Sequence, residues 1–316
     1  MVFGASGMAG AAFCSAAVRR GFETKAFSHR NPVKVDGIAG HTRLDLNDLN
    51  GLERPLLDMW PDVIVNAAAV SEPDKVDQDP EAATRINVDF PSRLAEIANH
   101  LGARLIHLSS DLVFDGSQSP YRSTDLPNPL SSYGKQKLDA EKKVLKRCPE
   151  NLVVLRVTIL TGNSPSGRRS VHEKMLRSIS KGKRLTLFAD EYRQPCSCDS
   201  LAAALVELCQ KPKLNGLFHW AGADRLSRYE MGQLILDRFA LPQEVLKTGE
   251  RKDFAGEDKR PADLAFNLQP LQGKLSTSPA TFSEQLEAMD VPDDLFPWFQ
   301  ENSQNPSCYV RRLVVD

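Results

Sequence analysis

The sequence predicts an α/β fold in which a doubly wound parallel sheet is joined to a smaller C-terminal lobe. Short apolar runs such as Val63–Asn66 alternate along the chain with longer amphipathic stretches. Strands that are apolar throughout are typical of parallel sheets with helices on both faces. A glycine-rich turn near the start of the chain fits the first crossover of such a sheet. The alternation loosens after Val157, where the smaller lobe is expected to begin.

The first element is a short strand, Val2–Phe3, which is followed by the sequence GASGMAG and a helix over residues 8–20. The helix is predicted because its residues are small and apolar on one face. Unpaired N–H groups at a helix N-terminus bind phosphate, and glycines let a phosphate approach the backbone closely. The turn therefore predicts a Rossmann-type dinucleotide site whose contact residues are Gly4, Ser6, Gly7, Met8 and Gly10. Because only three residues precede Gly4, the first strand is unusually short or the true start lies upstream of Met1.

The remaining elements follow from the periodicity of apolar residues. Strands are predicted over residues 23–27, 63–66, 104–108, 152–157 and 217–220, and helices over residues 49–60, 80–100, 133–147 and 199–210. We assign residues 1–160 to a NAD(P)-binding Rossmann domain and residues 161–316 mainly to a substrate-binding lobe. The strand at 217–220 is expected to return to the first sheet. Ligands of open α/β sheets bind beyond the carboxyl ends of the strands, so the later chain should cover that edge.

Three residues predict the chemistry of the site. Ser110 follows the strand at 104–108, and Tyr133 precedes Lys137 by one helical turn. A free phenol has a pKa of about 10, and an ammonium group one turn away is expected to lower that pKa. Tyr133 would then give a proton to a carbonyl oxygen that Ser110 holds, while hydride reaches the carbon. A Tyr-x-x-x-Lys spacing also arises by chance, so the prediction depends on its place after the glycine turn and after Ser109-Ser110-Asp111.

The composition excludes several classes of function. The 316 residues include 40 basic and 41 acidic ones, the net charge is −1, and no basic stripe with interleaved aromatic residues is present. Nucleic acid is therefore not an expected partner. No apolar run approaches the ~18 residues that span a bilayer, so no membrane association is expected and a cytoplasmic location is predicted. The six cysteines lack paired spacing, which favours reduced thiols over a metal site.

Several segments together resemble a known family. They are Gly4-x-x-Gly7-x-x-Gly10, Asn66-Ala67-Ala68-Ala69, Ile86-Asn87-Val88, the run SSDLVFDG at 109–116, Tyr133-x-x-x-Lys137 and Arg260-Pro261. This set, which extends from Met1 to about Leu275, resembles the extended short-chain dehydrogenase/reductases, and within them the dTDP-4-dehydrorhamnose reductase group. That group also includes the β regulatory subunit of methionine adenosyltransferase. The resemblance implies NADPH-dependent reduction of a 4-keto nucleotide sugar, as in dTDP-rhamnose biosynthesis. The alternative is a non-catalytic NADP-binding regulatory subunit.

The resemblance also implies the roles of single residues. Ser110, Tyr133 and Lys137 would be the catalytic trio, and Tyr133 and Lys137 would also contact the cofactor. Further cofactor contacts are predicted at Ser28, Arg30, Asp45, Leu46, Ala67, Ala68, Ala69 and Asn87. Two of these residues have a structural alternative, because Asp45 is also typical of a helix N-cap and Asn87 of a helix residue that satisfies nearby backbone.

Arg30 bears on the choice between NADP(H) and NAD(H). It falls at the end of the second predicted strand, where a guanidinium group pairs with the 2′-phosphate and a carboxylate would instead bind the ribose hydroxyls. The segment Ser28-His29-Arg30 therefore favours NADP(H), with NAD(H) as the alternative cofactor. It also disfavours an epimerase that recycles a tightly held NAD.

Three departures from the family pattern concern the substrate and the assembly. Leu112 replaces a tyrosine that is common in rhamnose reductases, and residues 190–196 only partly follow the pattern that lines the substrate side. The identity of the nucleotide-sugar substrate therefore stays open. Ala11-Ala12 replace an acidic residue that some rhamnose reductases use in a magnesium-linked dimer. Because alanines supply no oxygen ligands, we expect no metal site, and either a monomer or a homodimer without a metal bridge.

Overall fold

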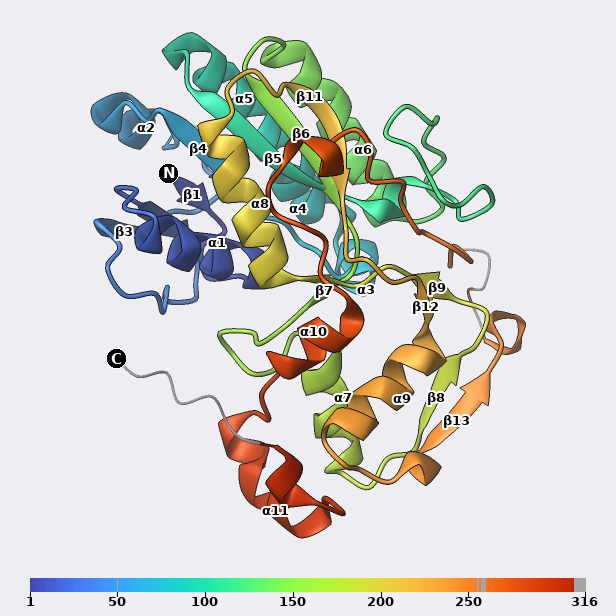
Figure 1. Cartoon of the computed structure of the whole chain (residues 1–316). Helices are drawn as coiled ribbons and strands as arrows, with labels where there is room; N and C mark the ends of the chain where they lie inside the picture. Colours follow the sequence, from blue (N-terminus) through green and yellow to red (C-terminus); the bar gives the residue numbers. More distant parts are fainter. Residues whose placement is uncertain (50, 255, 257–259, 310–316) are drawn as a thin grey trace.

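The computed structural model describes residues 1–49, 51–254, 256 and 260–309, and Figure 1 shows the course of the chain. Its larger part is built on a seven-stranded sheet with the order β11-β6-β5-β4-β1-β2-β3. These strands are β1 (Val2–Phe3), β2 (Lys25–Ser28), β3 (Gly40–Arg43), β4 (Val63–Asn66), β5 (Arg104–Ser110), β6 (Leu152–Val157) and β11 (Gly216–Trp220). All neighbouring pairs run parallel. The predicted doubly wound α/β fold is thereby confirmed.

Helices cover both faces of this sheet. They are α1 (Met8–Arg19), α2 (Glu53–Met59), α5 (Phe90–Leu101), α6 (Ser132–Arg147) and α8 (Cys198–Gln210). On one face α1 and α8 lie side by side (Figure 1), and their buried residues share a cluster with Val65 of β4. On the other face α2, α5 and α6 pack in a cluster with Ile64 of the same strand. Neighbouring strand residues point to opposite faces, so Ile64 and Val65 stabilise different layers.

The predicted bounds agree best where the apolar run is continuous. β4 and β6 begin and end at the predicted residues, and β11 returns to pair with β6 as expected. The predicted helix at 80–100 is divided into α4 (Pro80–Thr84), a π-helical turn (Arg85–Asp89) and α5. The predicted helix at 49–60 is shorter, and its residue 50 lies outside the described residues.

The periodicity does not predict β3, the strand at the edge of the sheet. It pairs only with β2 among the described residues, and each of its four residues is half-buried or exposed. An edge strand without a buried face carries no apolar run, so periodicity has nothing to detect there.

The later chain adds small sheets and a second hydrophobic core. Its strand pairs are β7 (Leu160–Thr161) with β10 (Cys196–Ser197), β8 (Leu185–Phe188) with β13 (Leu246–Gly249), and β9 (Tyr192–Arg193) with β12 (Leu226–Ser227). Its helices are α7 (Val171–Ile179), α9 (Arg228–Arg238), α10 (Phe282–Glu287) and α11 (Phe296–Asn302). In Figure 1 these helices lie below the large sheet, and their apolar faces form one buried cluster. By contrast, α8 and β11 pack with the large sheet although they occur late in the sequence.

Two connections follow the carboxyl ends of central strands. The segment after β4 carries α3 (Pro73–Gln78), and the segment after β5 begins with the 3-10 turn Asp111–Val113. Ligands of open α/β sheets bind at this edge, so both segments belong to the candidate site. Among the described residues no helix combines the length and apolar character needed to cross a membrane.

Candidate active site

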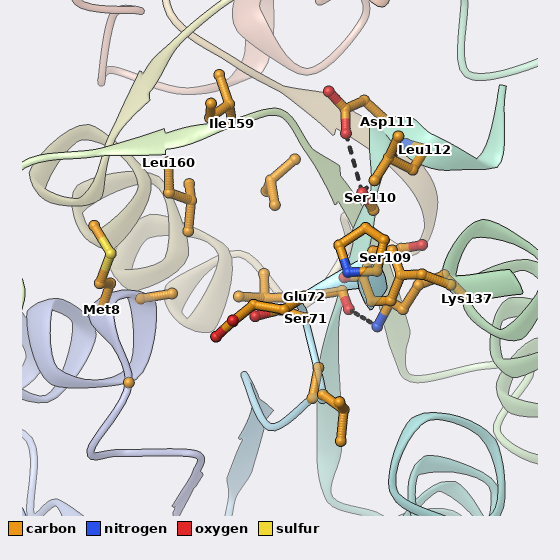
Figure 2. Close-up of a pocket in the computed structure, with 18 of the residues that line it drawn as sticks. Met8, Ser71, Glu72, Ser109, Ser110, Asp111, Leu112, Lys137, Ile159 and Leu160 are labelled. Carbon is orange, nitrogen blue, oxygen red and sulfur yellow. Dashed lines mark hydrogen bonds between the residues drawn. The ribbon is translucent and has the colours of Figure 1, made fainter. Parts of the chain in front are cut away.

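A cavity of about 930 Å³ lies at the carboxyl ends of the central strands. Its walls come from the glycine turn, the segments after β4 and β5, the start of α6, and parts of β9 and α9. Figure 2 shows Met8, Ser110, Lys137, Ile159 and Leu160 around this space. The cavity therefore brings the predicted dinucleotide site and the predicted catalytic residues together.

The glycine turn is shaped by close backbone contacts. Gly4 has a φ of 77°, and a Cβ there would lie 2.6 Å from the backbone nitrogen of Ala68. A Cβ on Gly10 would overlap the carbonyl oxygen of Gly4, so Gly10 allows α1 to pack against the turn. Gly7 begins α1 without a side-chain cap, which leaves N–H groups of the first turn free to bind an anion. These residues fit the pyrophosphate of a dinucleotide.

The three predicted catalytic residues lie close together in the cavity wall. Ser110 ends β5, and Tyr133 and Lys137 follow one another on the first turns of α6. The start of α6 is fixed by Ser131, whose side-chain oxygen accepts a hydrogen bond from the Gly134 N–H at 3.1 Å. This cap sets the angle at which Tyr133 and Lys137 face the cavity.

Lys137 is held by a backbone carbonyl rather than by a carboxylate. Its Nζ donates a hydrogen bond to the Leu108 oxygen at 2.7 Å, and the side chain is buried. Burial lowers the pKa of Lys137 to about 8, and the nearby Glu141 acts in the opposite direction. The amine therefore titrates at mildly alkaline pH, well below the range of an exposed lysine.

The expected lowering of the Tyr133 pKa is wrong for the structure. Burial raises the pKa of Tyr133, the charge of Asp111 raises it further, and hydrogen bonding with Ser110 opposes these effects only partly. Ser110 itself donates a hydrogen bond to Asp111 at 3.0 Å (Figure 2). Lys137 is not among the groups that shift this pKa, and its amine donates a hydrogen bond to the Leu108 carbonyl. The phenol consequently stays protonated at neutral pH.

The predicted cofactor contacts fall into two groups. Those that line the cavity are Gly4, Ser6, Gly7, Met8, Leu46, Ala67, Ala68, Ala69, Tyr133 and Lys137, whereas Gly10, Ser28, Arg30, Asp45 and Asn87 do not. His29 lines the cavity instead of its two neighbours. Ser28 is buried and donates a hydrogen bond to the backbone oxygen of Asn31 at 2.7 Å. Arg30 is exposed at the same end of β2.

Asp45 and Asn87 both bind nearby groups of the protein. Asp45 accepts hydrogen bonds from the backbone and side chain of Asn47, at 3.0 and 2.8 Å, and these contacts lower its pKa. Asn87 is buried and bonds both the N–H and the carbonyl of Val70, at 2.8 and 3.1 Å. It also donates to Gln136 at 2.9 Å. Asn87 thus fixes the cavity-lining segment after β4 against α6.

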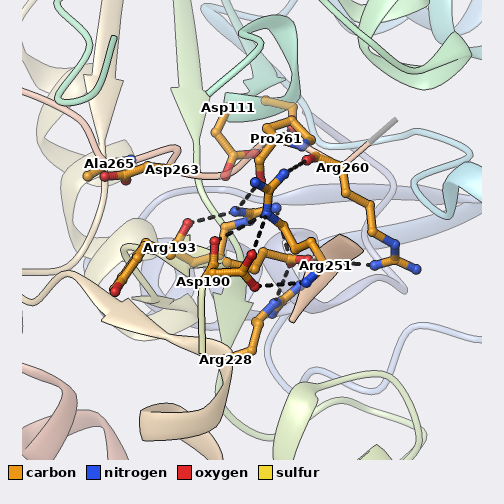
Figure 3. A network of polar contacts seen from close by, with 12 residues as sticks. Asp111, Asp190, Arg193, Arg228, Arg251, Arg260, Pro261, Asp263 and Ala265 are labelled. Carbon is orange, nitrogen blue, oxygen red and sulfur yellow. Dashed lines mark hydrogen bonds and ion pairs between the residues drawn. The ribbon is translucent and has the colours of Figure 1, made fainter. Parts of the chain in front are cut away.

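Three arginines line the other end of the cavity, and the sequence prediction did not assign them a role. Arg193, Arg228 and Arg260 surround the Glu191 carboxylate, with nitrogen–oxygen distances of 3.1, 2.9 and 3.7 Å. Figure 3 shows Arg193 and Arg228 in this network close to Asp111. Burial lowers the pKa of Arg193 to about 10, so its guanidinium group stays charged at neutral pH. Three guanidinium groups outnumber the acidic groups of Glu191 and Asp111 beside them and leave this end of the cavity positive, which favours an anionic ligand.

Leu112 and Ala11, which depart from the family pattern, lie in different parts of the structure. Leu112 lines the cavity, so an apolar side chain faces the space where the family commonly has a hydroxyl. Ala11 is buried on α1. No group of three or more histidine, cysteine, aspartate or glutamate residues in the described part of the chain could hold a metal ion.

Comparison with known proteins gives a family and named relatives. Residues 1–291 match the RmlD substrate binding domain family. The chain is 38% identical over 212 residues to methionine adenosyltransferase 2 subunit beta of Bos taurus, which covers 65% of this chain and 63% of that protein. It is 31% identical over 198 residues to dTDP-4-dehydrorhamnose reductase of Salmonella typhimurium, with 61% of this chain and 65% of that protein covered. The similarity thus spans less than two thirds of either relative's length.

Solved structures extend the similarity over nearly the whole fold. A hypothetical dTDP-4-dehydrorhamnose reductase from Sulfolobus tokodaii superposes with a TM-score of 0.78 at 29% identity, covering 92% of this chain and 98% of the other. The dTDP-4-dehydrorhamnose reductase of Bacillus anthracis, solved in complex with NADP, has a TM-score of 0.77 at 20% identity, with 90% and 96% covered. At 20% identity, the similarity to the Bacillus anthracis structure shows a shared fold and no more.

Proposed function

The chain belongs to the RmlD substrate binding domain family, and from this premise we propose that it reduces a 4-keto nucleotide sugar with NADPH, in the manner of a dTDP-4-dehydrorhamnose reductase. The observation that carries the proposal is one cavity that joins the glycine turn, the trio of Ser110, Tyr133 and Lys137, and a positively charged end. A nicotinamide cofactor, when bound, supplies the hydride. The glycine turn and the uncapped start of α1 would hold its pyrophosphate.

In this proposal the chain's own residues supply the proton and orient the ketone. Tyr133 would hydrogen-bond the ketone oxygen and release its proton to it as negative charge develops there. Ser110 would turn its single O–H from Asp111 to the same oxygen when the ketone binds. The phenol of Tyr133 is protonated at neutral pH and so has a proton to give, although burial and the charge of Asp111 raise its pKa and make it a weaker acid than a free phenol. The apolar Leu112 and Ile159 in the cavity wall would limit the access of water.

The positively charged end supports a nucleotide sugar as the substrate. Arg193, Arg228 and Arg260 present more positive charge than the Glu191 carboxylate neutralises, and planar guanidinium groups bind phosphate oxygens in pairs. A diphosphate bound there would place the sugar between the arginines and Ser110, because all these residues line the same cavity. The base and the sugar stay unassigned.

A substrate panel tests the proposal directly. Purified protein would be incubated with NADPH and a series of 4-keto nucleotide sugars, and the loss of NADPH absorbance would be followed. We expect turnover with at least one dTDP- or UDP-linked member. Binding of NADPH without turnover of any member would contradict the enzymatic proposal and favour a regulatory role.

The second candidate function is a non-catalytic NADP-binding regulatory subunit. The observation in its favour is the 38% identity to methionine adenosyltransferase 2 subunit beta, which exceeds the 31% identity to the Salmonella reductase. Under this alternative the cavity would bind the cofactor and the protein would act on a partner. Turnover in the substrate panel would displace this candidate.

Arg30→Ala tests the choice of cofactor. Loss of one charge-assisted contact to the 2′-phosphate should cost about 1.5–3 kcal/mol, so NADPH affinity should fall roughly ten-fold or more. NADH affinity should stay nearly unchanged, because NADH lacks that phosphate. Fluorescence titration with both cofactors measures the difference. Arg54→Ala is the matched control, since Arg54 is an exposed arginine that pairs with Asp58 on α2. Equal losses for NADPH and NADH would refute the role of Arg30.

Three further parts of the proposal concern organisation. We place the cofactor in residues 1–160 and the substrate mainly in residues 161–316, with α8 and β11 added to the first part because they pack on its sheet. We propose a monomer or a homodimer without a metal bridge, because Ala11 and Ala12 supply no ligand oxygens. A cytoplasmic location also remains a proposal.

A further inference from the structure

Three buried polar side chains form a continuous set of contacts beside the cavity. Asn66 at the end of β4 and His107 of β5 are direct neighbours in the register of the sheet, and Lys137 lies above them on α6. Asn66 and His107 are each 1% exposed and Lys137 is 2% exposed. Asn66 Nδ2 lies 3.1 Å from His107 Nδ1, and His107 Nε2 lies 3.5 Å from Lys137 Nζ.

The directions of these contacts follow from Asn66. Its side-chain oxygen accepts a hydrogen bond from the N–H of Ala68 at 3.1 Å, so its amide NH₂ group is the part that faces His107. His107 Nδ1 must then accept a hydrogen bond, which leaves the ring proton on Nε2. A charged imidazolium would set N–H against N–H at Asn66. Burial and the charge of Lys137 both lower the pKa of His107, in agreement with a neutral ring.

The Nε2–H group of His107 consequently faces the nitrogen of Lys137. An ammonium group has no lone pair, so it can only oppose this N–H, whereas a neutral amine can accept a hydrogen bond from it. The amine keeps its own donor contact to the Leu108 oxygen in either state.

Other charged groups around Lys137 are engaged elsewhere. Glu141 follows on the same helix, and its carboxylate accepts hydrogen bonds from Arg156 of β6, at 2.9 and 2.7 Å, and from Ser109 of β5 at 2.5 Å. Tyr133 precedes Lys137 on α6, and its phenol interacts with Ser110 at the end of β5 and with Asp111 directly after it. Within the described residues, His107 is therefore the side chain whose polar atom contacts the Lys137 amine.

We propose that His107 is a positioning residue: Asn66 fixes its Nε2–H tautomer, and this N–H favours the neutral amine of Lys137 and holds that amine beside the Leu108 carbonyl. Because Asn66 also binds the N–H of Ala68, the same contacts connect the cofactor-lining segment after β4 with the catalytic lysine. The role in catalysis rests on the proposed function, whereas the effect on the protonation of Lys137 does not.

The experiment measures the protonation of Lys137 in the whole protein. Trace acetylation with acetic anhydride across a pH series, followed by peptide mass spectrometry, reports the free-amine fraction of Lys137 against the exposed Lys146. We expect half-maximal labelling of Lys137 near its pKa of about 8. His107→Phe removes the facing N–H and His107→Gln supplies an acceptor oxygen, so both should move the midpoint upward by about one pH unit. His219→Phe, which removes another buried neutral imidazole from the sheet, should leave it unchanged.

Two further measurements test the role of His107 independently of the proposed reductase function. Nitrogen-15 spectra of histidine-labelled protein, with His107 identified by its loss in either variant, should show the neutral Nε2–H form. An Nδ1–H or charged ring, or an unchanged Lys137 midpoint in whichever variant folds, would overturn the proposal. A separate measurement compares the acetylation of Lys137 with and without NADPH, and bound cofactor should protect Lys137 from the reagent. Failure of that protection would count against the cofactor site and would leave the conclusion on His107 in place.

Discussion

Replacing Tyr133 with phenylalanine is expected to lower turnover by at least about 100-fold, the loss typical of removing a general acid. The ring is retained, so the packing of Tyr133 against Val76 and Ala83 should survive. NADPH affinity should also be kept, because the hydroxyl is assigned to the ketone and not to the cofactor's phosphates. Steady-state assays with the substrate found in the panel, together with NADPH fluorescence titration, measure both quantities.

Tyr121→Phe is the matched control for this change. Tyr121 is also buried, but its hydroxyl donates a hydrogen bond to Asp115 at 2.8 Å and it does not line the cavity. Its loss should leave turnover nearly unchanged. If Tyr133→Phe keeps most of the activity, another acid must donate the proton. Asp111 is then the candidate, because burial raises the pKa of its carboxyl group, and Asp111→Asn should abolish turnover.

The sequence predicts those strands that consist of a continuous apolar run. β4 and β6 are short apolar runs that are buried on both faces, and their bounds follow from sequence alone. β3 and the two-residue strands of the later chain carry no such run, because they are edge or isolated pairs whose stability comes from tertiary contacts. The π-helical turn at Arg85–Asp89 is likewise invisible to a 3.6-residue period.

Some residues of the candidate site could likewise be predicted from the sequence, and others could not. Ser110, Tyr133 and Lys137 belong to local motifs, so their meeting in one cavity could be anticipated. Arg193 and Arg228 could not be assigned, because their convergence on Glu191 depends on how β9 packs beside α9.

The direction of the Tyr133 pKa was also beyond sequence reasoning. Spacing placed Lys137 one helical turn away but gave neither the burial of the phenol nor the Leu108 carbonyl that takes the amine. A usable signal for His107 did exist. His107 is a polar residue between the apolar Ile106 and Leu108 of a buried strand, and such a residue needs a buried partner.

Arg156→Met is expected to destabilise the fold by about 3–5 kcal/mol, the cost of removing one partner of a buried ion pair. Arg156 and Glu141 are 3% and 2% exposed in their side chains and form two hydrogen bonds, at 2.9 and 2.7 Å. Methionine fills a similar volume, but it leaves the Glu141 carboxylate buried with only the Ser109 hydroxyl as a partner. Urea denaturation followed by circular dichroism, with wild type and variant compared at one pH, measures the loss.

A double variant shows whether the loss of stability comes from an unpaired buried charge or from poorer packing. Replacing both partners, Glu141→Met with Arg156→Met, should recover much of the stability, because no buried charge is left without a partner. In the single variant burial should raise the pKa of Glu141 above its value in the unfolded chain. The deficit should therefore shrink as the pH falls through that raised pKa and reach its full size above it, since protonation neutralises the buried group. A deficit that is independent of pH and equal in the single and double variants would instead point to lost packing against the Phe114 ring, which lies 4.9 Å from the guanidinium carbon.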